Sequence, residues 1–195
     1  MKEIRAFIAI ELSKEIREAL TRLQERLKSR IPHRSVRWVR VEGIHLTLKF
    51  LGDVPASSID GISQALEVAC GGFEPFTLEA AGLGCFPNSR RPRVLWVGVR
   101  EESGVLNRLQ KSVEDELARL GFERERRSFN PHLTLGRVQR RVSHNDRQRL
   151  GELIAESEVG LLDSMRVPAV KLMRSDLQPA GAVYTALARV ALGSG

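Results

Sequence analysis

Hydrophobic and polar positions follow two periods along the chain, and the changes of period mark the predicted elements. Short apolar runs typical of strands recur between stretches with apolar residues three or four apart, the spacing of one helix face. Ser13 stands where a helix N-cap would, ahead of Ile16, Leu20, Leu23 and Leu27. Further helices are predicted over about 55–71, 106–121 and 145–156. The predicted strands cover about 4–10, 36–39, 44–50, 76–86, 94–99, 132–138, 165–174 and 182–190.

The order of these elements predicts the fold class. Helices are separated by pairs of strands instead of alternating one to one with them, which favours an α+β fold with antiparallel sheets. The pattern of the first half recurs in the second, and no linker rich in glycine, serine or proline divides the two. We therefore expect residues 1–195 to form a single domain with two lobes.

Composition narrows the class of protein. With 195 residues, 42% hydrophobic and 28% charged, the chain has the balance of a soluble globular protein, which excludes a disordered, collagen-like or membrane protein. The net charge of +7 indicates a polyanionic partner. The apolar run 6–10 is too short for a signal peptide, so a cytoplasmic location is expected. Cys70 and Cys85 lack the spacing of a disulfide framework or a zinc site, and free thiols are expected.

One tetrapeptide occurs twice, as His45-Leu46-Thr47-Leu48 and as His132-Leu133-Thr134-Leu135. On a strand, residues two apart project from the same face, so each copy places an imidazole beside a hydroxyl and turns its leucines to the core. Two histidines in different surroundings can act as general base and general acid near neutral pH. Threonine hydroxyls can donate to phosphate oxygens without adding charge. The pair therefore indicates in-line displacement at phosphorus.

Two other interpretations of the motif stay open at this point. A histidine beside a threonine can simply belong to a half-exposed polar strand face. A zinc site built on the two histidines lacks a third ligand at recognisable spacing. Of the remaining histidines, His33 and His144 fit surface positions, and Trp38 and Trp96 fit the core.

The wider context of both motifs resembles a known family. The segments Arg5–Ile10, Val36–Val39, His45–Gly52 and Asn130–Arg137 look like the 2H phosphoesterase superfamily. They are most similar to its RNA 2′,3′-cyclic phosphodiesterase branch, historically called 2′-5′ RNA ligases. This resemblance implies a bilobal α+β fold with two antiparallel sheets and flanking helices in a pseudo-twofold arrangement, the motifs 45–48 and 132–135 facing each other across a central cleft.

The resemblance also implies a reaction and roles for individual residues. A terminal 2′,3′-cyclic phosphate on RNA would be hydrolysed to a 2′-phosphomonoester, with 2′-5′ joining of RNA ends as the reverse reaction and without a metal or other cofactor. The expected substrates are RNA ends such as tRNA fragments, and the expected state is a monomer. His45 matches the proton donor and His132 the proton acceptor. The matching substrate contacts are Thr47, Thr134 and Arg137 for the phosphate and Phe50 for the base.

Arginines flank the second motif on both sides, at positions 124, 126, 127, 137, 140 and 141. They fit either an electrostatic approach for RNA or a solvated loop face, because Glu123 and Glu125 are interleaved with them. Strict alternation places Arg137 on the face opposite His132, unless the strand bulges at Gly136.

Two other functions remain possible from the sequence. The chain could be a non-catalytic RNA- or nucleotide-binding module of the same fold. It could also act on another 2′-5′ or cyclic phosphodiester.

Overall fold

The computed structural model describes residues 3–178 and 181–193, and these form two antiparallel sheets and four α-helices. The four-stranded sheet has the order β3-β1-β8-β9, with bounds β1 (Glu3–Glu11), β3 (His45–Pro55), β8 (Ala169–Gln178) and β9 (Gly181–Ala191). The five-stranded sheet has the order β2-β6-β5-β4-β7, with bounds β2 (Val36–Trp38), β4 (Phe76–Phe86), β5 (Val94–Arg100), β6 (His132–Val138) and β7 (Leu161–Val167). The predicted α+β class with antiparallel sheets is confirmed.

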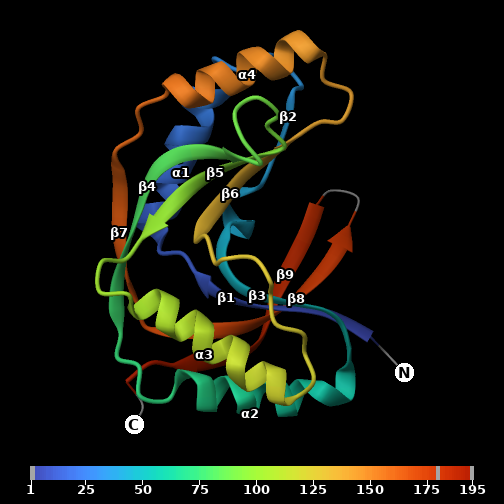
Figure 1. Ribbon diagram of the computed structural model, residues 1–195, viewed down its shortest axis with the longest axis vertical. Helices are drawn as coiled ribbons and strands as arrows, with labels where there is room; N and C mark the ends of the chain where they lie inside the picture. Colours follow the sequence, from blue (N-terminus) through green and yellow to red (C-terminus); the bar gives the residue numbers. More distant parts are fainter. Residues whose placement is uncertain (1–2, 179–180, 194–195) are drawn as a thin grey trace.

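The helices are divided between the sheets. Helices α2 (Ile59–Cys70) and α3 (Val105–Arg119) pack together beneath the four-stranded sheet, whereas α1 (Lys14–Lys28) and α4 (His144–Glu156) pack on the five-stranded sheet (Figure 1). Two 3₁₀ turns, η1 (Val41–Gly43) and η2 (Ala56–Ser58), lie on either side of β3. Helix α1 follows β1 of the four-stranded sheet along the chain but packs against the five-stranded sheet.

Local signals explain where α1 and β1 form. The Ser13 hydroxyl accepts a hydrogen bond from the Ile16 backbone N–H at 3.3 Å, which is the predicted N-cap. The four apolar residues expected on the inner face of α1 are buried. In β1 the whole run 6–10 is buried, as expected for a strand with neighbours on both sides and both faces covered.

The prediction of a single strand over about 165–174 is wrong. The chain forms β7, ends it before Pro168, and begins β8 at Ala169. Strand β7 pairs with β4 in the five-stranded sheet, whereas β8 pairs with β1 in the four-stranded sheet. Proline has no backbone N–H to donate to a ladder, and the chain crosses between the sheets here.

One cluster of buried apolar side chains spans both sheets and includes Ile8, Leu46 and Leu133 from the strands and Leu109 from α3. Strands from both halves of the sequence build each sheet, because β2 and β4 join the five-stranded sheet and β8 and β9 join the four-stranded one. Both motif strands are therefore anchored in the same core.

Candidate active site

Each tetrapeptide opens a strand. His45 is the first residue of β3 and His132 the first residue of β6. In both strands the histidine and the threonine are partly exposed, whereas all four leucines are buried. The alternation expected from the sequence is confirmed, and the face carrying the histidines and threonines is called the motif face below.

The two imidazoles are held by the same hydrogen bond. His45 Nδ1 lies 2.9 Å from the Gly43 carbonyl oxygen, and His132 Nδ1 lies 2.7 Å from that of Asn130. A carbonyl can only accept, so Nδ1 carries the proton and donates in both rings. Each Nε2 is then the nitrogen available for proton transfer.

The two motif strands contact each other although they belong to different sheets. The Val39 N–H donates to the Leu135 carbonyl at 2.9 Å, and the buried Gln24 amide of α1 donates to the carbonyls of both residues, at 2.9 and 3.0 Å. From Val39 the chain runs through η1 to Gly43, the acceptor for His45. The segment that orients His45 is thus attached to the strand that carries His132.

Aromatic rings surround the His45 imidazole. Phe7 stacks on it with ring centroids 4.6 Å apart, and Tyr184 meets it edge-on at 4.9 Å. Burial lowers the pKa of His45 below its ordinary value, and the hydrogen bond to Gly43 opposes this in part. In the free protein at neutral pH, the His45 ring is therefore mostly uncharged.

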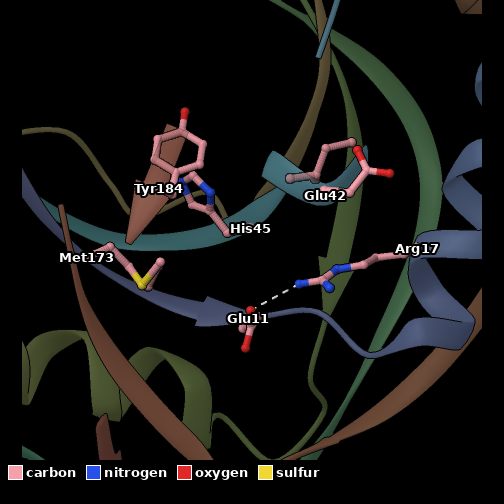
Figure 2. A pocket seen from close by; sticks show the side chains of 8 residues that line it. Glu11, Arg17, Glu42, His45, Met173 and Tyr184 are labelled. Atoms are coloured by element: carbon pink, nitrogen blue, oxygen red, sulfur yellow. Dashed lines mark ion pairs between the residues drawn. The ribbon is translucent and has the colours of Figure 1, made fainter. Parts of the chain in front are cut away.

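His45 also lines a small pocket (Figure 2). Arg17 reaches into it from α1 and pairs with Glu11 at 3.2 Å, and Glu11 also pairs with Lys171. These partners, Lys171 foremost, hold the pKa of the Glu11 carboxyl below its usual range. The remaining labelled side chains at the pocket are Glu42, Met173 and Tyr184. The wall beside His45 is thus partly polar, with its charges largely paired.

His132 has its own aromatic wall. Phe86 meets its ring edge-on at 4.9 Å, and the Trp96 centroid lies 6.4 Å away. Trp96, expected in the core, instead lies on the motif face of β5 opposite Thr134. A Cβ on Gly84 would come within 2.4 Å of the indole, so glycine is required for the ring to lie across β4. The expectation for Trp96 was wrong because its apolar strand also borders the motif face.

A bulge in β6 resolves the position of Arg137. Against β5, Thr134 pairs with Trp96 and Gly136 with Leu95, so Leu135 is an extra residue. Leu135 and Gly136 are both buried, and Arg137 is exposed. Arg137 therefore returns to the motif face. This is the alternative that the sequence left open, in which β6 bulges at Gly136.

Strand β3 has the same bulge. Thr47 pairs with Ala9 and Lys49 with Ile8, so Leu48 is extra, and Phe50 returns to the motif face. Phe50 is 71% exposed and lies 6.0 Å from Phe7, measured between ring centroids. Phe50 in β3 and Arg137 in β6 therefore occupy equivalent positions, five residues after each histidine.

The other predicted side chains are placed as follows. Of the six arginines flanking the second motif, Arg124 is paired with Asp115, and all six are exposed. His33 and His144 are exposed, as expected, and Trp38 packs against the core. Cys70 and Cys85 are free thiols.

Sequence reasoning missed the residues that surround the imidazoles. Phe7 lies inside a continuous buried run, Tyr184 is the single tyrosine of the chain, and Phe86 ends a strand. No motif connects any of them to a histidine far away in sequence, because the contacts depend on strand pairing. The alternation does place Gly84 and Phe86 on one face of β4, which is the signal that was available.

The structure also bears on metal binding and on membrane crossing. Within residues 3–178 and 181–193, no group of three or more histidine, cysteine, aspartate or glutamate side chains is placed to hold a metal ion. Among the helices formed by those same residues, none combines the length and apolar character needed to cross a membrane.

Comparison with known proteins gives a consistent result. The LigT like phosphoesterase family matches the chain twice, over residues 10–96 and 97–184, with one motif in each match. A relative from Methanothermobacter thermautotrophicus named RNA 2′,3′-cyclic phosphodiesterase is 40% identical over 183 residues, covering 94% of this chain and 96% of the relative.

Solved structures agree with this match. The crystal structure of TT0787 of Thermus thermophilus has a TM-score of 0.78 and 28% identity, covering 97% of this chain and 98% of that one. The crystal structure of E. coli LigT complexed with 3′-AMP has the same TM-score and identity, covering 99% of this chain and all of that one.

Proposed function

Because the chain belongs to the LigT-like phosphoesterase family, we propose that it is an RNA 2′,3′-cyclic phosphodiesterase, the activity named for several of its relatives. The proposed reaction hydrolyses the cyclic phosphate at an RNA end and leaves a 2′-phosphomonoester. The observation that carries the proposal is the pair of imidazoles on contacting strands, each donating through Nδ1 to a backbone carbonyl and keeping Nε2 free.

In the proposed step, His132 Nε2 takes a proton from water as the water oxygen bonds to phosphorus. The P–O3′ bond breaks on the opposite side, and His45 donates its Nε2 proton to the departing O3′. One water is consumed, the 2′ oxygen keeps the phosphate, and solvent returns both imidazoles to their starting states. Both proton transfers come from side chains, so the step as written uses no metal ion or cofactor.

Substrate binding prepares His45 for its role as acid. Burial favours the uncharged ring in the free protein, because it lowers the pKa of His45. A phosphodiester bound beside Nε2 brings a negative charge, which favours the protonated ring. Protonation of His45 and binding of the cyclic phosphate are therefore linked.

The motif face supplies the remaining contacts. The Thr47 and Thr134 hydroxyls stand beside the two imidazoles and donate to the non-bridging phosphate oxygens. Arg137 is brought to the same face by the bulge in β6 and adds a charged donor. Its counterpart in β3, the exposed ring of Phe50, offers a stacking surface for the terminal base.

The same groups also support the joining of RNA ends, because a 5′-hydroxyl can attack the cyclic phosphate as water does in hydrolysis; this joining is the reverse of the cleavage of a 2′-5′ bond to a cyclic phosphate. A 5′-hydroxyl of a second RNA takes the place of water, loses its proton to His132, and attacks the cyclic phosphate. The product is a 2′-5′ linkage with a free 3′-hydroxyl. Fragments of a cleaved tRNA are suitable substrates for testing this reaction.

The proposal is tested with a nucleoside 2′,3′-cyclic phosphate in the presence of EDTA. His45→Ala and His132→Ala are each expected to lower kcat by about 10²- to 10⁴-fold, the usual contribution of one proton transfer, while circular dichroism stays unchanged. The exposed histidines offer matched controls, so His33→Ala and His144→Ala should retain activity. Identification of the product as the 2′-monophosphate checks which bond is cleaved.

Three outcomes would contradict this assignment. Turnover at the wild-type rate in the His45→Ala, His132→Ala double variant would show that the two histidines are not the acid and the base. No turnover by the wild-type protein, together with measurable nucleotide binding, would favour a binding module. Faster cleavage of a 2′-5′ linked dinucleotide than of any cyclic phosphate would favour a different phosphodiester.

A further inference from the structure

Two arginines lie directly opposite each other on neighbouring strands. Arg37 of β2 is in register with Arg137 of β6. Residues directly opposite in an antiparallel pair project from the same face. Arg137 is on the motif face because of the bulge, and both side chains are exposed, so Arg37 also lies on the face of His132 and Thr134.

Among the described residues, no carboxylate forms an ion pair with Arg37 or Arg137. Over residues 3–178 and 181–193, neither Arg37 nor Arg137 has a carboxylate oxygen within 4.0 Å, whereas Arg124 and Arg174 each have an aspartate partner. Like charges directly opposite in a sheet are destabilising. A phosphate between the two guanidinium groups would relieve the repulsion and accept hydrogen bonds from both.

Positive charge continues beyond the pair. Arg140 and Arg141 follow β6, and the β4–β5 loop carries Arg90, Arg91 and Arg93, all exposed. The end of β6 is joined to this loop, because the N–H of Val138, the last residue of β6, donates to the Arg93 carbonyl at 2.9 Å.

Helix α4 also connects the β4–β5 loop to the segment that follows β6. Arg147 of α4 donates to the carbonyls of Pro92 and Gln139, at 2.9 and 3.2 Å. The adjoining basic segments make the positive surface longer than one phosphate, which suits a single strand of nucleic acid better than a free anion.

We propose that Arg37 binds the backbone phosphate immediately 5′ of the nucleotide that carries the cyclic phosphate. Arg137 then stands between the two phosphates, and the RNA strand leaves the catalytic histidines along β6 toward the joined basic segments. The assignment rests on the proposed function, because it takes the cyclic phosphate to lie between His45 and His132. It gives the enzyme a preference for an RNA end over a lone nucleotide.

The test compares one substrate that has this phosphate with one that lacks it. A nucleoside 2′,3′-cyclic phosphate has no 5′ phosphate, whereas a short oligoribonucleotide ending in the same cyclic nucleotide has one. Arg37→Ala is expected to lower kcat/KM about 10- to 100-fold on the oligoribonucleotide, as for loss of a hydrogen bond to a charged group, and less than about threefold on the nucleoside.

Two variants serve as controls. Arg37→Lys should retain part of the preference for RNA, because it keeps the charge and loses the planar fork. Arg22→Ala removes an exposed arginine from α1 and should leave kcat/KM on both substrates unchanged.

A binding measurement tests the same contact without turnover. With a labelled oligoribonucleotide ending in a 2′-phosphate, fluorescence anisotropy should show weaker binding by Arg37→Ala. The slope of log affinity against log salt should become shallower by about 0.7, the value for one phosphate contact on a single strand.

Equal losses on the two substrates, no loss on either, or an unchanged salt slope would each overturn the role of Arg37. If the wild-type protein turned over neither substrate, the proposed function would fail by itself. The anisotropy comparison would then still decide whether Arg37 binds RNA.

Discussion

At the scale of single residues, His45 and His132 show how identical motifs acquire different surroundings. Both rings donate through Nδ1 to the carbonyl two positions before them. His45, however, is enclosed by Phe7 and Tyr184, and the loss of hydration lowers its pKa. Residues outside the motifs, and not the motifs themselves, therefore make the surroundings of the two rings different.

This enclosure predicts the pH dependence of the reaction. If His45 is the acid, kcat/KM must fall as pH rises through the pKa of His45 in the free enzyme, which burial places below the ordinary 6.5. Tyr184→Ala admits water to the ring, raises that pKa, and should move the alkaline limb of the profile to higher pH. Tyr184→Phe keeps the ring and should leave the limb in place. A limb that stays fixed, or moves to lower pH, in Tyr184→Ala would contradict the assignment of His45 as the acid.

At the scale of elements, the shared bulge places different residues at equivalent positions. The residue after the extra leucine turns inward in both strands, and it is Lys49 in β3 and Gly136 in β6. Gly136 is required because a Cβ there would lie 2.6 Å from Val36 Cγ1. Lys49 instead crosses to α3, where its Nζ lies 2.6 Å from Glu114 Oε2 and 2.7 Å from the Glu123 carbonyl oxygen. The ion pair thereby connects β3, α3 and the loop that leads to His132.

Removing one member of this buried pair should be costly. Lys49→Met leaves the Glu114 side chain buried without its cationic partner, and we expect a loss of about 3–5 kcal/mol in the free energy of unfolding, measured with urea. The double variant Lys49→Met, Glu114→Leu removes both charges and should recover most of that loss. A loss below about 1 kcal/mol for Lys49→Met would mean that the pair contributes no more than an exposed one.

At the scale of the whole molecule, the two halves of the sequence exchange strands. The four-stranded sheet takes β1 and β3 from the first half and β8 and β9 from the second, and the five-stranded sheet places β4 beside β5 and β7. Helix α1 of the first half packs on β7 of the second. Although the family matches the chain as two consecutive repeats, neither repeat has a complete sheet of its own.

This exchange predicts the behaviour of a divided chain. A break in the β4–β5 loop, giving fragments 1–90 and 91–195, leaves β2 and β4 without the strands that lie between them. Each fragment alone should show no cooperative unfolding transition by circular dichroism, whereas co-expression should restore a folded, active complex. A cooperative transition in fragment 1–90 by itself would show that a repeat is an independent folding unit.

Much of the fold and of the candidate site follows from local patterns. The Ser13 cap, the helical spacing of Ile16 to Leu27, and the His-Leu-Thr-Leu alternation all act over a few residues, and the structure contains each of them. The strand predicted across Pro168 failed because local alternation cannot indicate which sheet a strand will join. Trp96 was misplaced for a similar reason, since an apolar strand residue can face either the core or a functional site.

The amino-acid sequence by itself determined the elements, the antiparallel α+β class, and the two histidine-threonine pairs, because helix and strand periodicity are properties of neighbouring residues. Only the tertiary structure decided which side chains surround those pairs. The bulges that bring Phe50 and Arg137 to the motif face, the enclosure of His45 by Phe7 and Tyr184, and the opposition of Arg37 to Arg137 arise from pairing between distant strands. Pairing of this kind is settled by the packing of the shared core and leaves no local periodic signal.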